Sequence, residues 1–120
     1  MIKYGRSVVF TVMPWPDAGL INPRGETIFL RKETWFNHIY HGHPELRNCL
    51  GDVILAVREP EAIYKDKDRN AFVCYKYGER SGMFIVVVYE MSSGTGHVKT
   101  AYTSPQPYIE LAYLPKVWSP

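Results

Sequence analysis

The chain has 120 residues, of which 46% are apolar and 22% are charged, with a formal net charge of +2. This length suits a single domain with a real core, and the apolar content excludes an intrinsically disordered chain. The small net charge excludes a protein that holds nucleic acid by general electrostatic attraction, so any RNA contact should be local.

The two cysteines, Cys49 and Cys74, both lie within apolar patterns and form no short-spaced pair. This arrangement excludes a disulfide framework and a zinc knuckle, and it predicts buried thiols in a reducing compartment. The opening residues lack the apolar run and cleavage site of a signal peptide. No segment approaches the roughly 18 apolar residues of a membrane span. We therefore expect a cytoplasmic protein with no membrane partner.

The first 26 residues predict an N-terminal β extension. The stretch SVVFTVM (7–13) has the β-branched content of a strand. Residues 14–25 are interrupted by prolines and end in a glycine, which predicts a loop. The stretch TIFLR (27–31) predicts a short second strand.

Two consecutive amphipathic helices are predicted next. Thr34 can cap the start of the first helix, and Gly42 is placed to end it. Pro44 suits the first position of the second helix, and Pro60 stops it. The apolar residues that repeat with helical period are Trp35, Phe36, Ile39 and Tyr40, then Leu46, Leu50, Val53, Ile54 and Val57.

The second half of the chain predicts four strands joined by tight turns, at residues 62–65, 71–77, 83–91 and 97–103. Short turns between consecutive strands imply an antiparallel meander. The Pro-rich tail predicts an extended C-terminal arm that covers a sheet edge or a neighbouring subunit. The predicted fold is therefore α+β: two helices packed on a four-stranded antiparallel sheet, with the N-terminal β extension and the C-terminal arm.

Three of the four histidines, His38, His41 and His43, lie within six positions. On a helical wheel His41 faces solvent and His38 lies at the boundary of the apolar face, while His43 follows at the helix junction. The three rings do not converge as zinc ligands do, so no metal is expected. The positions of His38 and His43 suit a general acid or base. The alternative is a helix-capping His43 and a structural, partly buried His38.

The predicted turn at 66–70 and the last predicted strand carry further candidate groups. Arg69 could contact phosphate as a forked donor, although its turn, DKDRN, can equally be a solvated loop. Thr100 and Tyr102 lie on the same side of their strand. A sheet face that carries tyrosine, threonine and lysine is compatible with base stacking and phosphate contact, and also with an ordinary mixed surface.

The order of these motifs resembles that of a known family. The pattern runs from TW..HI...HPEL at 34–46 through V..A...P..IY at 53–64 to FIVVVYE and VKTAYTS at 84–90 and 98–104. Over residues 27–104 the chain resembles the phage-associated nuclease-like family grouped with barnase, EndoU, colicin-type and RelE ribonucleases. The most specific matches are Trp35, His38, Ile39, His43, Pro44 and Glu45, then Pro60, Ile63 and Tyr64, then Thr100, Ala101 and Tyr102.

The resemblance implies a single domain in which a nuclease core at 27–104 is flanked by an extension at 1–26 and an arm at 105–120. The implied reaction is metal-independent and needs no cofactor: a ribose 2′-hydroxyl attacks the adjacent RNA phosphodiester. The resemblance implies that His38 and His43 act as the acid and base. It implies that Thr100 and Tyr102 donate hydrogen bonds to the phosphate. Arg69 and Lys76 would stabilise its negative charge.

The resemblance also implies partners. RNA would be the substrate, and an antitoxin or immunity protein would neutralise a toxin-like enzyme carried by a mobile element. The two termini could serve homo-oligomerisation. Gly42 departs from the family pattern, in which a basic residue precedes the HPE motif, and His41 could supply that charge. Two other functions stay open: a non-catalytic RNA- or protein-binding module of the same fold, and a small histidine-ligated metal protein.

Overall fold

The computed structural model describes Trp15 and residues 19–120, so the strand predicted at 7–13 lies outside the described residues. The described residues form one seven-stranded sheet in the order β2-β3-β7-β6-β5-β4-β8. Its strands are β2 (Leu20–Ile21), β3 (Thr27–Phe29), β4 (Ala62–Lys65), β5 (Ala71–Gly78), β6 (Met83–Ser92), β7 (Thr95–Ser104) and β8 (Lys116–Trp118). Neighbouring strands are antiparallel except β3 and β7, which are parallel.

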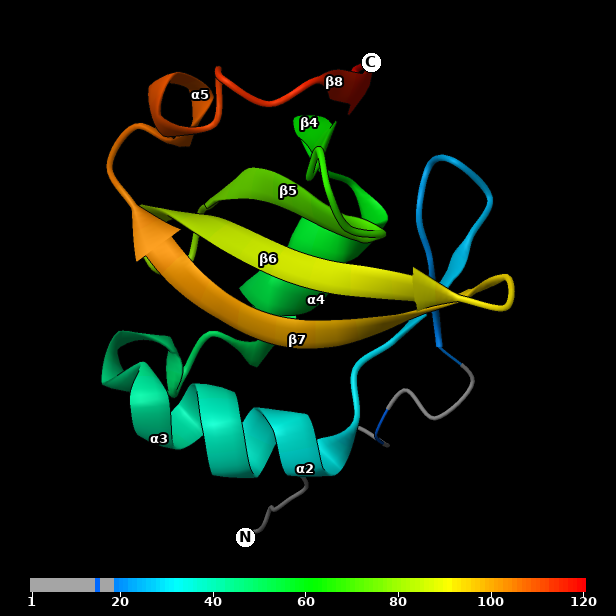
Figure 1. The fold of residues 1–120 in the computed structure, drawn as a ribbon. Helices are drawn as coiled ribbons and strands as arrows, with labels where there is room; N and C mark the ends of the chain where they lie inside the picture. The colour runs from blue at the N-terminus through cyan, green and yellow to red at the C-terminus, as the bar shows by residue number, and fades with distance from the viewer. Residues whose placement is uncertain (1–14, 16–18) are drawn as a thin grey trace, which may run out of the picture.

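The helical segments pack around this curled sheet (Figure 1). The first helix runs without interruption from Lys32 to Gly42 through α2 (Lys32–Thr34), a π-helical turn (Trp35–Ile39) and α3 (Tyr40–Gly42). The later segments are a 3-10 turn (Pro44–Leu46), α4 (Leu50–Arg58) and α5 (Pro107–Glu110). In Figure 1, α4 lies behind the central strands and the first helix runs along β7. No helix within residues 19–120 is long and apolar enough to cross a membrane.

The predicted fold class, two helices on a four-stranded antiparallel sheet, is wrong. Strand-like stretches separated by tight turns correctly located the antiparallel strands β4 to β7, but β2, β3 and β8 join the same sheet. β3 pairs in parallel with residues 95–97 of β7, and β8 pairs with β4. These short strands are held by partners distant in sequence, which local hydrophobic patterns do not report.

The predicted helix boundaries also need correction. The second helix is shorter than expected, because Pro44 begins a 3-10 turn and the backbone is non-helical at Cys49 before α4 starts. The first helix begins at Lys32 after the extended Arg31, so Thr34 lies inside it and makes no side-chain capping hydrogen bond. The helix ends at Gly42, as predicted.

Apolar side chains cover both faces of the sheet. On one face, Val53 and Val57 of α4 pack in the main core with Ile85 of β6 and with side chains of the first helix. On the other face, a smaller core joins Leu111 of the C-terminal segment to buried residues of β4, β5 and β6, among them Tyr64. The C-terminal segment therefore packs against the second face of the sheet.

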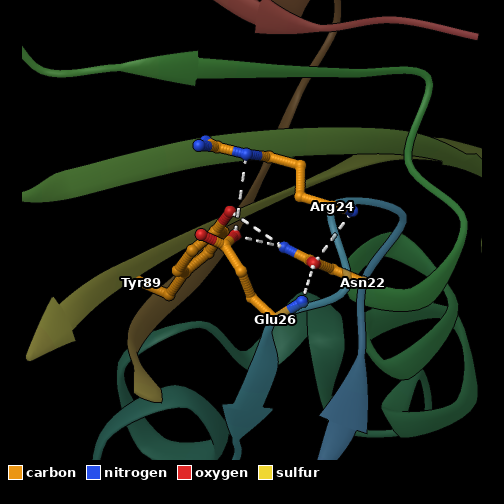
Figure 2. A network of polar contacts seen from close by, with 4 residues as sticks. All are labelled: Asn22, Arg24, Glu26 and Tyr89. Carbon is orange, nitrogen blue, oxygen red and sulfur yellow. Dashed lines mark hydrogen bonds and ion pairs between the residues drawn. The ribbon is translucent and has the colours of Figure 1, made fainter. Parts of the chain in front are cut away.

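Figure 2 shows the polar contacts that hold the β2–β3 hairpin against β6. The side-chain oxygen of the buried Asn22 accepts hydrogen bonds from the backbone N–H groups of Arg24 (3.1 Å) and Glu26 (2.9 Å). Its amide donates to Glu26 Oε1 (3.0 Å) and to the Tyr89 hydroxyl (3.3 Å). Burial raises the pKa of Tyr89, so its hydroxyl stays neutral. These contacts anchor the hairpin from which the first helix starts.

Candidate functional site

His43 lies at the junction between the first helix and the 3-10 turn. Its N–H donates to the carbonyl of Ile39 (2.8 Å), and its carbonyl accepts the N–H of Leu46 (2.9 Å). Its backbone angles, φ −134° and ψ 76°, are non-helical, so the chain changes direction between Gly42 and Pro44. Because both backbone groups are hydrogen-bonded, the junction fixes the point from which the imidazole projects.

The imidazole of His43 lies beside a carboxylate and a tyrosine ring. Its Nδ1 is 3.8 Å from Oε2 of Glu45, and the two side chains are 32% and 36% exposed. The centroid of the His43 ring is 6.4 Å from that of Tyr102 on β7. The Thr103 hydroxyl donates to the same oxygen of Glu45 at 3.5 Å. We call these four residues, His43, Glu45, Tyr102 and Thr103, the His43 site.

The hydroxyl of Tyr102 is neutral. Burial, followed by the neighbouring ionisable groups of Glu110 and Tyr113, raises the pKa of Tyr102. The hydroxyl is therefore protonated at neutral pH and can donate a hydrogen bond. Thr100 lies two residues earlier on the same strand and is also partly buried. Since side chains alternate along a strand, Thr100 and Tyr102 share one side of β7.

His38 and His41 are exposed on the first helix, whereas His38 was expected at a half-buried boundary. His38 belongs to the π-helical turn, in which the N–H of Tyr40 donates to the carbonyl of Trp35. In a π-helical turn each hydrogen bond spans five residues and not four. The side chains therefore do not follow the 100° spacing of an α-helical wheel, which is why the wheel misplaced His38. Within the described residues, His38 takes part in no side-chain hydrogen bond, ion pair or ring contact. The structure thus brings His43 and Tyr102 together without placing His38 in contact with them.

Arg69 and Lys76 lie apart from the His43 site. Arg69 forms an ion pair with Glu90 of β6 (3.8 Å). Tyr102 pairs with Val86, which lies four residues before Glu90 on the same strand. Four residues of a strand span roughly 13 Å. Lys76 lines a depression beside Asp52 of α4. Tyr102 instead packs with the smaller core on the opposite face of the sheet.

Glu45 and Arg47 are the neighbours of His43 whose roles the sequence analysis missed. The signal for Glu45 was the triplet His43-Pro44-Glu45, because a proline that starts a 3-10 turn brings the two flanking side chains together. Arg47 donates from Nε to the carbonyl of Tyr40 (2.8 Å), and its guanidinium lies 4.9 Å from the centre of the Tyr40 ring. This contact holds a permanent positive charge near the end of the first helix.

Metal and thiol chemistry find little support in the described part of the chain. No group of three or more His, Cys, Asp or Glu side chains within it could hold a metal ion. Cys49 and Cys74 are free and buried. Burial raises the pKa of Cys49, and it raises that of Cys74 to about 12. Both thiols are therefore protonated at neutral pH, whereas nucleophilic attack needs the thiolate.

A hollow of about 410 Å³ lies at the end of the sheet, next to the His43 site. Its walls come from the β5–β6 hairpin, through Tyr77 and residues 82–84, and from the end of β7, through residues 103–105. Thr103 belongs to both regions, because it lines the hollow and donates to Glu45. The hollow and the His43 site are therefore adjacent at Thr103.

Comparisons with known proteins identify no relative of this chain. No protein-family model matches it, and no curated protein or solved structure does so. The resemblance to the nuclease-like family therefore stays a prediction.

Proposed function

We propose that this protein is a metal-independent, toxin-like endoribonuclease that cleaves RNA at the His43 site. The observation that carries the proposal is the position of His43, half-exposed, with Nδ1 3.8 Å from Glu45 and its ring beside Tyr102. A carboxylate beside one imidazole nitrogen orients the ring and leaves the other nitrogen for a substrate proton. The neutral hydroxyl of Tyr102 provides a hydrogen-bond donor on the neighbouring strand.

The proposed reaction transfers one phosphodiester bond. His43 Nε2 takes the proton of a ribose 2′-hydroxyl, and that oxygen attacks the adjacent phosphorus. The bond between phosphorus and the 5′-oxygen of the next nucleotide breaks, and the leaving oxygen takes a proton from an acid, for which His38 is the candidate. The products are a 2′,3′-cyclic phosphate and a free 5′-hydroxyl. The hydroxyls of Tyr102 and Thr100 donate to the phosphate oxygens while negative charge develops there.

The biological setting follows from this activity. An enzyme that cleaves cellular RNA must be restrained in its own host, so the proposal includes a neutralising antitoxin or immunity protein. The free, buried thiols of Cys49 and Cys74 suit a reducing compartment, and we propose the cytoplasm. Assembly through the chain ends stays part of the proposal.

The decisive experiment is RNA cleavage in the presence of EDTA. Single-stranded RNA of mixed sequence should yield fragments with 2′,3′-cyclic phosphate and 5′-hydroxyl ends. His43→Ala should lower the rate by about 100-fold or more, the usual contribution of a general acid or base. His41→Ala is the matched control, because His41 is exposed on the same helix and outside the His43 site. His38→Ala tests the proposed acid separately.

Three outcomes would change the proposal. Equal cleavage by wild-type protein and His43→Ala would remove His43 from the mechanism. RNA binding without cleavage would favour a non-catalytic binding module. Stoichiometric zinc in the purified protein, with loss of activity in EDTA, would favour a metal protein.

A further inference from the structure

Two aromatic side chains, Tyr77 and Phe84, line the hollow beside the His43 site, and Tyr108 contacts Phe84. Tyr77 is 45% exposed and Tyr108 is 47% exposed, although both are large rings. Each meets Phe84 in a perpendicular contact, with centroids 5.3 Å apart for Tyr77 and 5.7 Å apart for Tyr108. In a perpendicular contact the edge of one ring meets a face of the other, so the contact leaves at least one face of each ring uncovered.

A glycine forms part of the wall of this hollow. Gly82 in its wall has φ +73°, a left-handed conformation that side chains rarely adopt. A Cβ at this position would point toward the Tyr77 hydroxyl, 3.9 Å away. Glycine therefore leaves the Tyr77 hydroxyl without a side-chain neighbour from position 82.

We propose that this hollow binds the nucleobase adjacent to the phosphodiester that is cleaved, an inference that rests on the proposed function. The volume of about 410 Å³ lies within the range of small-ligand sites. Aromatic side chains bind single-stranded RNA by stacking on its bases. Thr103 lines the hollow and also contacts Glu45, so the hollow lies next to the His43 site. The proposed nucleotide has its phosphate at His43 and its base beside Tyr77.

Binding of small probes tests the subsite without cleavage. Adenosine 3′-monophosphate, uridine 3′-monophosphate and inorganic phosphate are titrated into the wild-type protein by calorimetry in EDTA. The nucleotides should bind more tightly than phosphate, because only they carry a base. Tyr77→Ser should weaken nucleotide binding by about fivefold or more, the effect expected from losing one stacking contact, and leave phosphate binding unchanged.

Two further variants control for general damage to the protein. Phe36→Ser removes a ring of similar exposure, 49%, from the first helix and should leave nucleotide binding unchanged. Phe84→Leu keeps an apolar side chain in the wall but removes the aromatic ring, and should weaken nucleotide binding as Tyr77→Ser does. Circular dichroism verifies that each variant is folded.

The outcomes separate this inference from the proposed function. Nucleotide binding that is no tighter than phosphate binding, or that is unchanged in Tyr77→Ser and Phe84→Leu, overturns the base subsite even if RNA is cleaved. Tyr77-dependent nucleotide binding without RNA cleavage supports the subsite and contradicts the nuclease. With both activities present, Tyr77→Ser should also reduce the preference for particular bases at the cleavage position.

Discussion

Oε2 of Glu45 lies 3.8 Å from Nδ1 of His43, with only Pro44 between the two residues in the chain. The same oxygen accepts the hydroxyl of Thr103 on β7. The carboxylate therefore ties the helix junction to the sheet and holds the imidazole next to Tyr102. In the proposed mechanism Glu45 is a positioning residue for His43.

Replacing Glu45 with glutamine should lower the rate of RNA cleavage by roughly 10- to 100-fold, because the amide keeps the shape but loses the charge that orients the imidazole. The effect should appear in kcat, with KM nearly unchanged. Glu33→Gln, at an exposed position on the first helix, is the control. A loss confined to KM would assign Glu45 to substrate binding instead.

Removing only the hydroxyl of Tyr102, in Tyr102→Phe, should reduce cleavage by about 100-fold if it donates to the phosphate in the transition state. The ring would still pack beside His43, so the free energy of unfolding should change little. Tyr64→Phe removes a hydroxyl from the distant strand β4 and should leave the rate unchanged. Equal rates for the wild type and Tyr102→Phe would eliminate the hydroxyl from the reaction.

Asn22→Ala should destabilise the protein by about 2–3 kcal/mol, because four hydrogen bonds of a buried amide are lost together. Tyr89→Phe loses one of these bonds but keeps the stacked contact with Phe72, so about 1 kcal/mol is expected. Urea unfolding followed by far-UV circular dichroism measures both values. A smaller effect for Asn22→Ala than for Tyr89→Phe would contradict the anchoring role of Asn22.

The parallel pairing of β3 and β7 depends on a glycine. A Cβ at Gly96 would collide with the side chain of Ile28 on β3 and lie 2.9 Å from Sδ of Met91. Gly96→Ala should therefore cost about 1–3 kcal/mol through overpacking. Gly51→Ala, on α4 with open space around it, should be neutral or slightly stabilising. Thermal unfolding compares the two, and equal midpoints would indicate that β3 does not approach β7 as described.

Stability should decrease at alkaline pH. Burial raises the pKa of Cys74 from about 9 to about 12. Between these values the unfolded chain has released the thiol proton while the folded chain retains it. The stabilisation is therefore complete below pH 9 and is lost as the pH rises toward 12.

Replacing Cys74 with alanine isolates its share of this pH dependence. The free energy of unfolding, measured in urea at about pH 8 and about pH 10, should fall less in Cys74→Ala than in the wild type. Part of the slope should persist, because burial also raises the pKa of Tyr89. Identical slopes in the two proteins would contradict deep burial of the thiol.

The local sequence was sufficient to predict those strands and turns that depend on residues only a few positions apart. Apolar stretches bounded by turn residues located β5 and β6, because a strand and the tight turn that ends it are both encoded within a few residues. Gly42 and Pro44 predicted the break that presents His43, since glycine disfavours continuation of a helix and proline fixes its own φ and lacks an N–H. The second helix was predicted to be too long. Its apolar residues keep a helical period through residues 44–49, although the backbone there does not form a continuous α-helix.

Tertiary structure alone decided which groups meet. Glu45 and Thr103 are 58 residues apart, and no local pattern brings them into contact. The sheet places Lys76 on the opposite face from Tyr102 and carries Arg69 to the far end of β6. The parallel β3 and the C-terminal β8 likewise depend on partners far along the chain. The geometry of a site assembled from distant segments depends on the packing of the whole sheet. Candidate site residues could therefore be named from the sequence, but which of them lie close together could not be predicted.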